Sequence, residues 1–365
     1  MKILGIESSC DETAAAIVED GKTLLSNVVR TQIDIHKVYG GVVPEIAARS
    51  HIEVINPVIE QALQDAHLSW DDIDGIAVTY APGLSGSLLV GTLAARTLAL
   101  LKNKPLLPIH HVEAHVYANF ITGQAEHINL SLPSRQPAFP MLALIVSGGH
   151  SQLVLFKDHG DYELLGQTQD DAVGEAFDKV AKIIGLPYPG GPSIAEAALQ
   201  GDSKKYPLPK AKMQGAYDFS FSGLKTAVLR AVQREVSVDT TFPSFKLPEL
   251  LNDVQRKDFA ASFQRVAIET LVDKAEAAFN DYSPASVVIA GGVAANQELR
   301  RELQDRLPIT IEYAPMQLCT DNAAMIATLG CFYAEKVAPS SPFSLEIHPS
   351  LSMTKTAWSK PLLQN

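Results

Sequence analysis

The sequence of 365 residues has little cysteine and no long uninterrupted apolar segment. Its three cysteines, Cys10, Cys319 and Cys331, lack the spacing of a disulfide framework or a CxxC-type metal site, which indicates a reducing compartment. The longest apolar stretch, residues 88–101, is interrupted by an arginine and is too short to cross a bilayer. The chain reaches Glu7 after a short apolar run, so we expect no signal peptide. The sequence therefore predicts a cytoplasmic protein with no membrane association.

Positive charge is also scarce, with 30 Lys and Arg against 41 Asp and Glu and a net charge of −11. A protein held to nucleic acid by a general basic field would have the opposite balance. Any nucleic-acid contact must therefore be local or come from another subunit. One region is locally basic and contains Lys179, Lys182, Lys204, Lys205, Lys210, Lys212, Lys225 and Arg230. Clustered charges of this kind usually form a solvated face. The alternative is that this region contacts a phosphate backbone.

The two halves of the sequence share one pattern of elements. Each opens with three β-rich segments and then alternates helix and strand patterns. The opening strands are predicted at 2–7, 13–19 and 23–30, and at 141–146, 152–156 and 162–168. Further strands are predicted at 73–80, 106–109, 286–290 and 310–313, and helices at 44–66, 85–102, 171–184, 221–235, 258–280, 296–307 and 321–335, with another helix starting near His110.

This order predicts an α/β protein with two RNase H-like domains of the actin/hexokinase/Hsp70-like (ASKHA) architecture, facing each other across a cleft. We expect residues 1–124 and 321–345 to form the first domain, which carries the candidate metal-ligand helix. Residues 140–320 form the second domain, and the proline-rich segment 125–139 is the linker. Residues 346–365 are expected to be an irregular tail.

A candidate metal site lies in the sequence His-Val-Glu-Ala-His. On a helix, His111 and His115 point from the same face and can share one metal ion. Chance alone also produces this spacing in exposed or core histidines. Asp321, at the start of the last helix, is a candidate third ligand, although aspartate there is more often a helix cap. Two histidines and one carboxylate leave open coordination positions and suit Zn²⁺ or Fe²⁺.

The same motif argues against a zinc peptidase. Such an enzyme needs the catalytic glutamate directly after the first histidine. Val112 occupies that position here, and Glu113 lies roughly 200° around the helix from the metal face. A metallopeptidase is therefore the least favoured of the alternatives.

Three turns are candidate nucleotide contacts: two contain glycine, and the turn at 8–13 offers hydroxyls and two carboxylates instead. Residues 147–150 join two strands, residues 8–13 occupy the equivalent turn of the first half, and residues 291–296 connect a strand to a helix. Glycine lets backbone N–H groups approach a phosphate closely, although a plain hairpin turn would have the same sequence. Likewise, residues 189–192 are either a structural turn or a ligand surface, and Asp178 is either a ribose contact or a solvated helix charge.

Taken together, the motifs resemble those of the tRNA N6-adenosine threonylcarbamoyltransferase family (TsaD or Gcp, formerly described as O-sialoglycoprotein endopeptidases). The resemblance extends over nearly the whole chain. The motifs are GIESSCDET at 5–13, YGGVVPE at 39–45, APGL at 81–84, HHVEAH at 110–115, VSGGH at 146–150, GEAFDK at 174–179, YPGGP at 188–192, FSFSGLK at 219–225 and CTDN at 319–322.

The resemblance implies specific roles for the candidate residues. It implies that His111, His115 and Asp321 bind one iron or zinc ion. Many family members carry an aspartate where this chain has Ala195, and the segment 237–257 is longer than the family pattern. The residues implied to line the nucleotide-substrate site are Val146, Ser147, Gly148, Gly149, His150, Asp178, Gly191 and Asn296.

The resemblance also implies a reaction and partners. The donor would be threonylcarbamoyl-AMP, and the acceptor N6 of adenosine 37 in tRNAs that read codons starting with A, giving t6A and AMP. Asp11 or Glu12, at the first turn, would take the amine proton or position the amine. A TsaB-like paralogue and a TsaE-like ATPase are the implied protein partners.

Two alternatives remain open at this stage. A small-molecule kinase or ATPase of the same architecture would share the glycine turns but would not need the histidine pair, because Mg²⁺ prefers oxygen ligands. A non-catalytic scaffold, such as the degenerate paralogue in this family, would lack the metal histidines that are present here.

Overall fold

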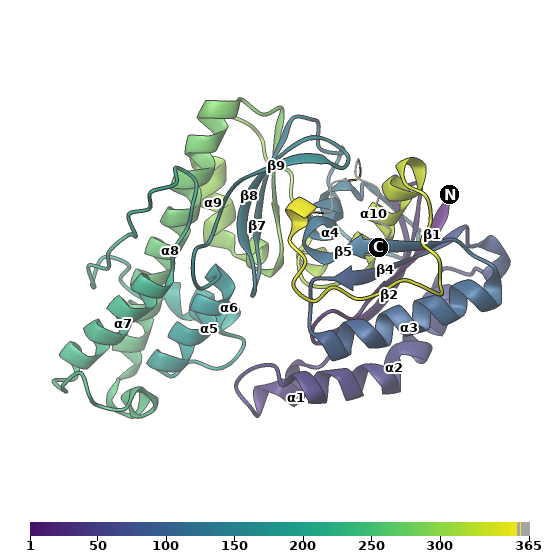
Figure 1. The fold of residues 1–365 in the computed structure, drawn as a ribbon. Helices are drawn as coiled ribbons and strands as arrows, with labels where there is room; N and C mark the ends of the chain where they lie inside the picture. The colour runs from purple at the N-terminus through teal and green to yellow at the C-terminus, as the bar shows by residue number, and fades with distance from the viewer. Residues whose placement is uncertain (356–357, 359–365) are drawn as a thin grey trace.

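The computed structural model describes residues 1–355 and residue 358. Within this part the chain forms two β-sheets, and Figure 1 shows the two halves side by side with helices around each sheet. The first sheet has the order β5-β4-β1-β2-β3-β6 and the second β10-β7-β8-β9. The strands are β1 (Lys2–Glu7), β2 (Glu12–Glu19), β3 (Thr23–Thr31), β4 (Gly75–Ala81), β5 (Leu106–His110), β6 (Gly123–Gln124), β7 (Met141–Val146), β8 (Ser151–Asp158), β9 (Asp161–Gln167) and β10 (Ser286–Ala290).

Helices flank both sheets. The α-helices are α1 (Ile33–Lys37), α2 (Pro44–Asp65), α3 (Ser85–Lys102), α4 (His111–Tyr117), α5 (Val173–Ile184), α6 (Gly190–Ala198), α7 (Ser222–Glu235), α8 (Asp253–Tyr282), α9 (Gln297–Arg306) and α10 (Ala323–Lys336). Short 3-10 helices lie at Trp70–Asp72, Ala118–Phe120, Ser244–Leu250, Gly292–Ala295, Met316–Leu318 and Met353–Lys355.

The first sheet is buried on both faces. Successive residues of a strand point to opposite faces, so Ile3 and Ala16 join the core beneath α4 and α10, whereas Leu4 and Ile17 join the core beneath α2 and α3. The predicted three-strand meander β1-β2-β3 is confirmed. The turn between β2 and β3 has left-handed φ angles at Asp20 (53°) and Gly21, as an Asp-Gly hairpin turn requires.

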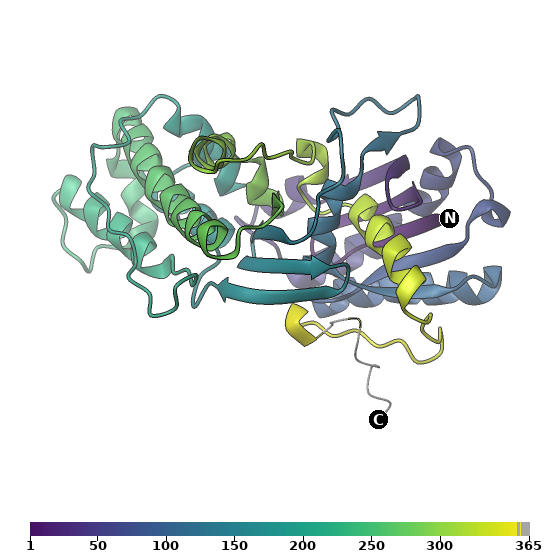
Figure 2. The same cartoon turned by 90° about the horizontal axis from the view of Figure 1, so that it is seen from above.

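The second sheet repeats the opening meander as β7-β8-β9 and adds β10 in parallel with β7. Its apolar strand β7 is fully buried. The core does not stop between the halves, because α4 contacts α10 and β5 of the first half as well as β7 and β10 of the second. In Figure 2 the two halves are seen from above with this contact region between them. Helix α4 is thus held rigidly at the junction.

Residues 340–353, called here the C-terminal strap, run back over the junction. Ser340 N–H donates to the carbonyl of Leu106 (2.9 Å), and His348 N–H donates to the carbonyl of Tyr80 (2.9 Å), both in the first half. Gly83 N–H in turn donates to the strap at Pro349. The strap therefore extends along the first half, as the yellow segment of Figure 2 shows.

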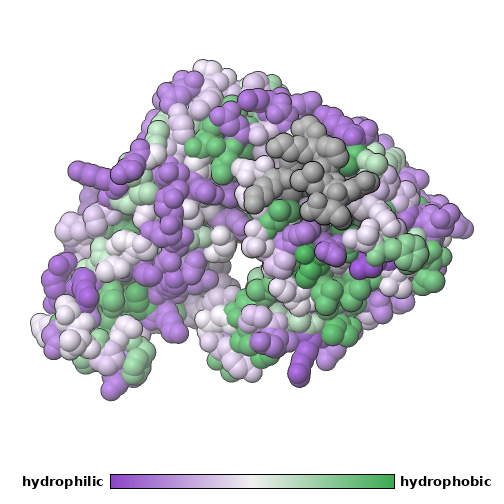
Figure 3. All heavy atoms as spheres, in the orientation of Figure 1, coloured by the Kyte–Doolittle hydropathy of each residue, from purple (hydrophilic) through white to green (hydrophobic). Residues whose placement is uncertain are grey.

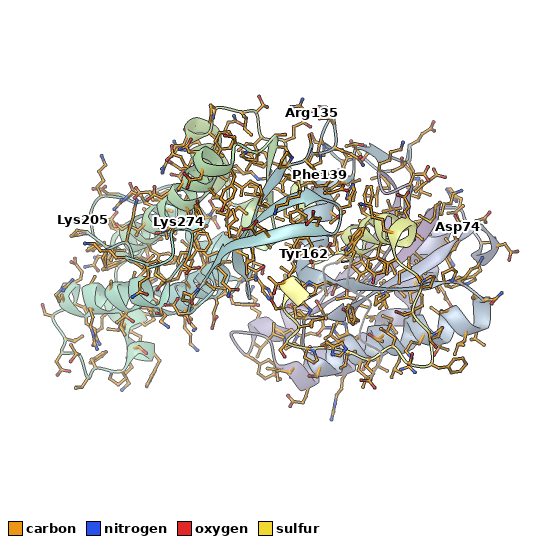
Figure 4. The ribbon with its side chains drawn as sticks, turned by 45° about the horizontal axis from the view of Figure 1, so that its top comes forward. Asp74, Arg135, Phe139, Tyr162, Lys205 and Lys274 are labelled. Atoms are coloured by element: carbon orange, nitrogen blue, oxygen red, sulfur yellow. The ribbon has the colours of Figure 1, made fainter. Side chains whose placement is uncertain are left out.

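The end of the strap reaches the other half. His110 Nε2–H donates to the carbonyl of Leu351 (3.0 Å), and Tyr162 OH, on β9, donates to the carbonyl of Met353 (2.9 Å). Figure 4 labels Tyr162 beside this segment. Beyond it, Trp358 Nε1–H donates to Glu113 on α4 (3.0 Å). The predicted irregular tail contains only a short 3-10 helix among its described residues, yet it is bonded to both halves.

Two predictions of local structure are wrong. Residues 310–313 form no strand, because side chains rather than a neighbouring strand bond this segment: Ile311 N–H donates to Gln304. Residues 189–192, for which a structural turn was one of two alternatives, instead begin helix α6 at Gly190. Among the described residues, no helix combines the length and apolarity needed to cross a membrane.

Candidate metal centre and facing turns

Helix α4 starts directly after β5 and carries the histidine pair. His110 caps the helix, because its Nδ1 accepts from the N–H of Glu113 (3.4 Å). His111 and His115 follow one turn apart on one face, with ring centroids 4.7 Å apart and planes at 78°. Both are buried. Glu113 points away from them toward Tyr162 and Trp358, as the helical spacing predicts.

Asp321 meets the histidine pair from the far end of the sequence. Its Oδ1 lies 3.5 Å from His111 Nε2 and 3.2 Å from His115 Nε2. The cap of α10 is Asn322, whose side chain accepts from Met325 N–H (3.1 Å), so Asp321 is not used as the cap. One ligand atom from each of the three residues lies within 4.8 Å of the others.

This donor set fits a Zn²⁺ or Fe²⁺ ion. Neither ring nitrogen of His115 makes a hydrogen bond with any described residue, although its Nε2 is close to Asp321. A buried polar atom without a partner is costly. Two imidazoles and one carboxylate, converging without mutual hydrogen bonds at His115, are typical of a metal site with open positions.

The three residues also perturb one another electrostatically. Burial opposes charge on His111, but the carboxylates of Asp321 and Glu7 raise its pKa well above the usual range. Burial likewise opposes charge on Asp321, yet His111 and then His115 hold the pKa of Asp321 far below its usual range. The site therefore strongly favours a positive charge between the imidazoles and the carboxylate.

Asp11 and Glu12 lie at the turn between β1 and β2, near this centre. Asp11 is 8% exposed. Burial, followed by the charges of Asp321 and Asp11, raises the pKa of Glu12 to about 10. Thr31 Oγ1 donates to Glu12 (3.3 Å). At neutral pH and without a nearby cation, Glu12 therefore holds its proton.

The turn at residues 147–150 is a tight hairpin. Ser147 N–H donates to the carbonyl of His150 (2.8 Å), and Ser147 Oγ accepts from His150 N–H (3.1 Å). Gly148 and Gly149 at its tip are exposed, and a side chain on either would meet open space. The backbone of the tip is therefore accessible to a ligand, while Val146, immediately before it, is buried.

Charge effects connect this turn and its neighbours with the first half. Burial, followed by the charges of His111 and His115, lowers the pKa of His150 to about 4. Burial, with smaller effects of Glu175 and Asp11, raises the pKa of Asp178. Burial, followed by the charge of Asp11, also raises the pKa of Tyr188. The predicted facing of the two sets of turns agrees with these interactions, and Figure 3 shows a notch between the two halves.

Two other predicted nucleotide contacts, Asp178 and Asn296, already form hydrogen bonds within the protein. Asp178 Oδ1 accepts from the N–H of Gly190 (2.7 Å), which fixes the start of α6 next to Gly191. Asn296 caps α9 by accepting from Leu299 N–H, and its amide donates to Gln264 (2.9 Å). Their proposed role in binding a nucleotide is not excluded by these bonds and stays a prediction.

The structure adds two residues that the sequence did not indicate, Glu7 and Thr79, and gives Ser9, from the turn at 8–13, a contact with a metal ligand. Glu7 Oε2 lies 3.0 Å from His111 Nδ1 and accepts from Thr79 Oγ1 (2.5 Å). Ser9 Oγ also lies 3.1 Å from His111 Nδ1. The signal for Glu7 was a carboxylate that directly follows an apolar run, residues 3–6, at the end of β1.

Comparison with solved structures defines the class of the fold. HypF from T. kodakarensis has a similar fold with a TM-score of 0.58 at 13% identity, over 92% of this chain and 48% of that chain. Two halves that each open with a β-meander and alternate helix and strand make this an ASKHA protein, as predicted.

Sequence comparison defines the family. The model of the family described as "TsaD: tRNA N6-adenosine threonylcarbamoyltransferase" matches residues 23–328. A protein of that name from Thermomicrobium roseum is 49% identical, over 97% of each chain. One from Bacillus subtilis is 46% identical, over 97% of this chain and 96% of its own. This chain belongs to the tRNA N6-adenosine threonylcarbamoyltransferase family.

Proposed function

We propose that the protein transfers the threonylcarbamoyl group of threonylcarbamoyl-AMP to N6 of adenosine 37 in tRNAs that read codons starting with A. The N6 amine attacks the carbamoyl carbonyl, the bond to the phosphate oxygen breaks, and AMP leaves while the amine loses a proton. The observation that carries the proposal is the convergence of His111, His115 and Asp321 beside the turn at 147–150, in a chain of this family.

The metal centre is proposed to hold one Fe²⁺ or Zn²⁺ ion through His111, His115 and Asp321. When bound, the ion would supply a Lewis acid and a template for the threonylcarbamoyl end of the donor. The chain itself contributes the fixed geometry. Helix α4 is packed between both halves, so its two imidazoles cannot move independently of the junction.

The AMP portion is proposed to lie over the turn of the second half. Backbone N–H groups at exposed glycines can approach a phosphate without obstruction. The proposed lining is Val146, Ser147, Gly148, Gly149, His150, Asp178, Gly191 and Asn296. Ala195 offers no polar group at a position where many relatives have an aspartate, so Asp178 would be the principal carboxylate for the ribose.

Asp11 or Glu12 is proposed to handle the proton of the attacking amine. Both are at the turn between β1 and β2 of the first half. The charges of both contribute to the raised pKa of Tyr188 in the second half. A carboxyl group with a raised pKa, such as that of Glu12, is a strong proton acceptor whenever it is ionised. The RNA base would have to unstack to reach this position.

The partners are proposed to be tRNA, threonylcarbamoyl-AMP, a TsaB-like paralogue and a TsaE-like ATPase, acting in the cytoplasm, where tRNA is found. The division into domains at 1–124 with 321–345, and 140–320, joined by 125–139, is also proposed. It is supported by α10, which packs on β1 and β2 of the first sheet.

A direct transfer experiment tests the function. Purified protein, unmodified tRNA and threonylcarbamoyl-AMP are mixed with the candidate partners. The tRNA is then digested, and its nucleosides are identified by mass spectrometry. We expect t6A with the wild type, and a loss of it with His111→Ala at unchanged thermal stability. Normal transfer by His111→Ala would contradict the metal role. Phosphorylation of a small molecule without t6A, by protein free of iron and zinc, would support the kinase alternative.

A further inference from the structure

We propose that Glu7 is a positioning residue of the metal centre: its carboxylate accepts the Nδ1–H of His111 and thereby directs the Nε2 lone pair toward the site shared with His115 and Asp321. This inference rests on the proposed metal site and adds the residue that sets the orientation and tautomer of one of its ligands.

The carboxylate of Glu7 is held on both oxygens. Glu7 ends β1 and is 0% exposed. Its Oε1 accepts from Ser9 N–H (2.5 Å), and its Oε2 accepts from Thr79 Oγ1 (2.5 Å) while lying 3.0 Å from His111 Nδ1. A carboxylate anchored in this way presents a fixed acceptor to the imidazole.

The tautomer of His111 follows from the chemistry of its two neighbours. Ser9 Oγ, 3.1 Å from Nδ1, could donate or accept. An ionised carboxylate has no hydrogen and only accepts, so Glu7 requires the proton to be on Nδ1. In the neutral ring, Nε2, which lies 3.5 Å from Asp321 Oδ1, is then left with a lone pair for a metal ion. A carboxylate on the outer nitrogen is the usual way in which a metal-binding histidine is oriented.

His115 is held differently. Its Nδ1 has no hydrogen-bond partner among the described residues, and its ring is fixed by burial at 2% exposure. The centre therefore contains one ring oriented by a hydrogen bond and one oriented by packing. A change at Glu7 should affect His111 alone.

Glu7→Gln is a diagnostic substitution, because it keeps the size but replaces one acceptor oxygen with an NH₂ donor. If the NH₂ takes the position of Oε2, it faces His111 Nδ1 and stabilises the opposite tautomer, with a proton on Nε2. If it takes the position of Oε1, it faces the N–H of Ser9, and two donors oppose each other. Neither orientation preserves all three bonds.

The test is the affinity for Zn²⁺, measured by competition with a chromophoric chelator. We expect Glu7→Gln to bind Zn²⁺ about 10–100-fold more weakly than the wild type. Glu113→Gln is the matched control, because Glu113 is also a buried glutamate (2% exposed) but faces away from the site. Its affinity should equal that of the wild type. Equal affinities of Glu7→Gln and the wild type would overturn the inference, whereas a wild type that binds no Zn²⁺ would overturn the metal site itself.

A second measurement needs no substitution of Glu7 and covers the case in which Glu7→Gln does not fold. Long-range ¹H–¹⁵N correlation spectra of Zn²⁺-loaded wild type, labelled at histidine, identify the protonated nitrogen of each ring. His111 is assigned by the signal that disappears in His111→Ala. We expect a proton on Nδ1 of His111, and a proton on Nε2 would overturn the inference.

Discussion

At the scale of single residues, the metal ligands were predictable because their signal is local or motif-based. Helical spacing alone places His111 and His115 on one face, and the structure agrees. The approach of Asp321 was a hypothesis supported by resemblance, since 206 positions separate it from His115. Glu7 was missed because its contact with His111 depends on the registers of β1 against β4 and of β4 against β5, which no local pattern specifies.

Glu12 gives a prediction at this scale. Glu12→Gln should lower the rate of transfer by about 10²–10⁴-fold, since a general base is lost. Asp11→Asn, measured in parallel, shows which carboxylate acts on the amine. Glu19→Gln, at the opposite end of β2, is the control and should retain full activity. Equal transfer rates in the wild type, Glu12→Gln and Asp11→Asn would contradict the proton-transfer role of the turn between β1 and β2.

Glu12→Gln, which should slow the transfer, should nevertheless stabilise the metal-free protein. In the metal-free protein the folded-state pKa of Glu12, about 10, exceeds its ordinary value of 4.5. Between these values the folded state binds the extra proton, so wild-type stability falls as pH rises. Glu12→Gln removes this penalty. We expect its thermal midpoint, relative to wild type, to increase from pH 5 to pH 8, and a decrease would contradict the burial argument.

At the scale of elements, most helices and strands follow from periodicity, and the failures have physical causes. The continuous apolar runs in β1 and β2 fit strands that are buried on both faces. Residues 310–313 have strand-forming residues, but no strand in the described part of the chain pairs with them. The glycines at 190 and 191 suggested a turn, yet they begin α6 because a carboxylate from α5, that of Asp178, accepts from the first N–H.

Asp170 provides a prediction for an element. It accepts from the N–H of Phe221 (2.8 Å) and from the hydroxyls of Ser220 and Ser222 (both 2.5 Å) at the start of α7. Partial burial would raise the pKa of Asp170, but these bonds hold it below its usual value. Asp170→Asn should therefore lower the free energy of unfolding by about 0.5–2 kcal/mol at pH 7.

This effect should depend on pH in a defined direction. A depressed carboxyl pKa stabilises the folded state above the unfolded pKa, and the contribution is lost as pH falls through the folded value. The difference between wild type and Asp170→Asn in urea unfolding should shrink below about pH 4. Asp253→Asn, exposed at the start of α8, is the control and should show a smaller difference at pH 7. A difference independent of pH would contradict the argument.

At the scale of the whole molecule, the local basic region is smaller than the sequence suggested. Lys179 and Lys225 form salt bridges with Asp171, and Lys210 pairs with Glu269 and Asp273. In the described part of the chain, no salt bridge involves the remaining members of the region, which are Lys182, Lys204, Lys205, Lys212 and Arg230. Figure 4 labels Lys205 at the outer end of the second half.

These unpaired lysines are where contact with tRNA phosphates is expected. Lys204→Glu together with Lys205→Glu should weaken tRNA binding and lower the slope of log affinity against log salt by roughly 1.4 to 1.8, for two lost phosphate contacts. The control is Lys22→Glu with Lys102→Glu, two exposed lysines of the first half. Filter binding at several salt concentrations measures both. An equal change of slope in the two double variants would indicate a general charge effect.

The C-terminal strap sets a limit on how far the halves can separate. Its beginning is bonded to β5 of the first half at Leu106, and its end accepts a hydroxyl hydrogen bond from Tyr162 of the second half. Any hinge rotation that widens the entrance for an RNA loop must either break the bond at Met353 or pull the strap off Tyr80 and Gly83. The strap therefore opposes separation of the halves, although it supplies none of the side chains proposed to touch the substrate.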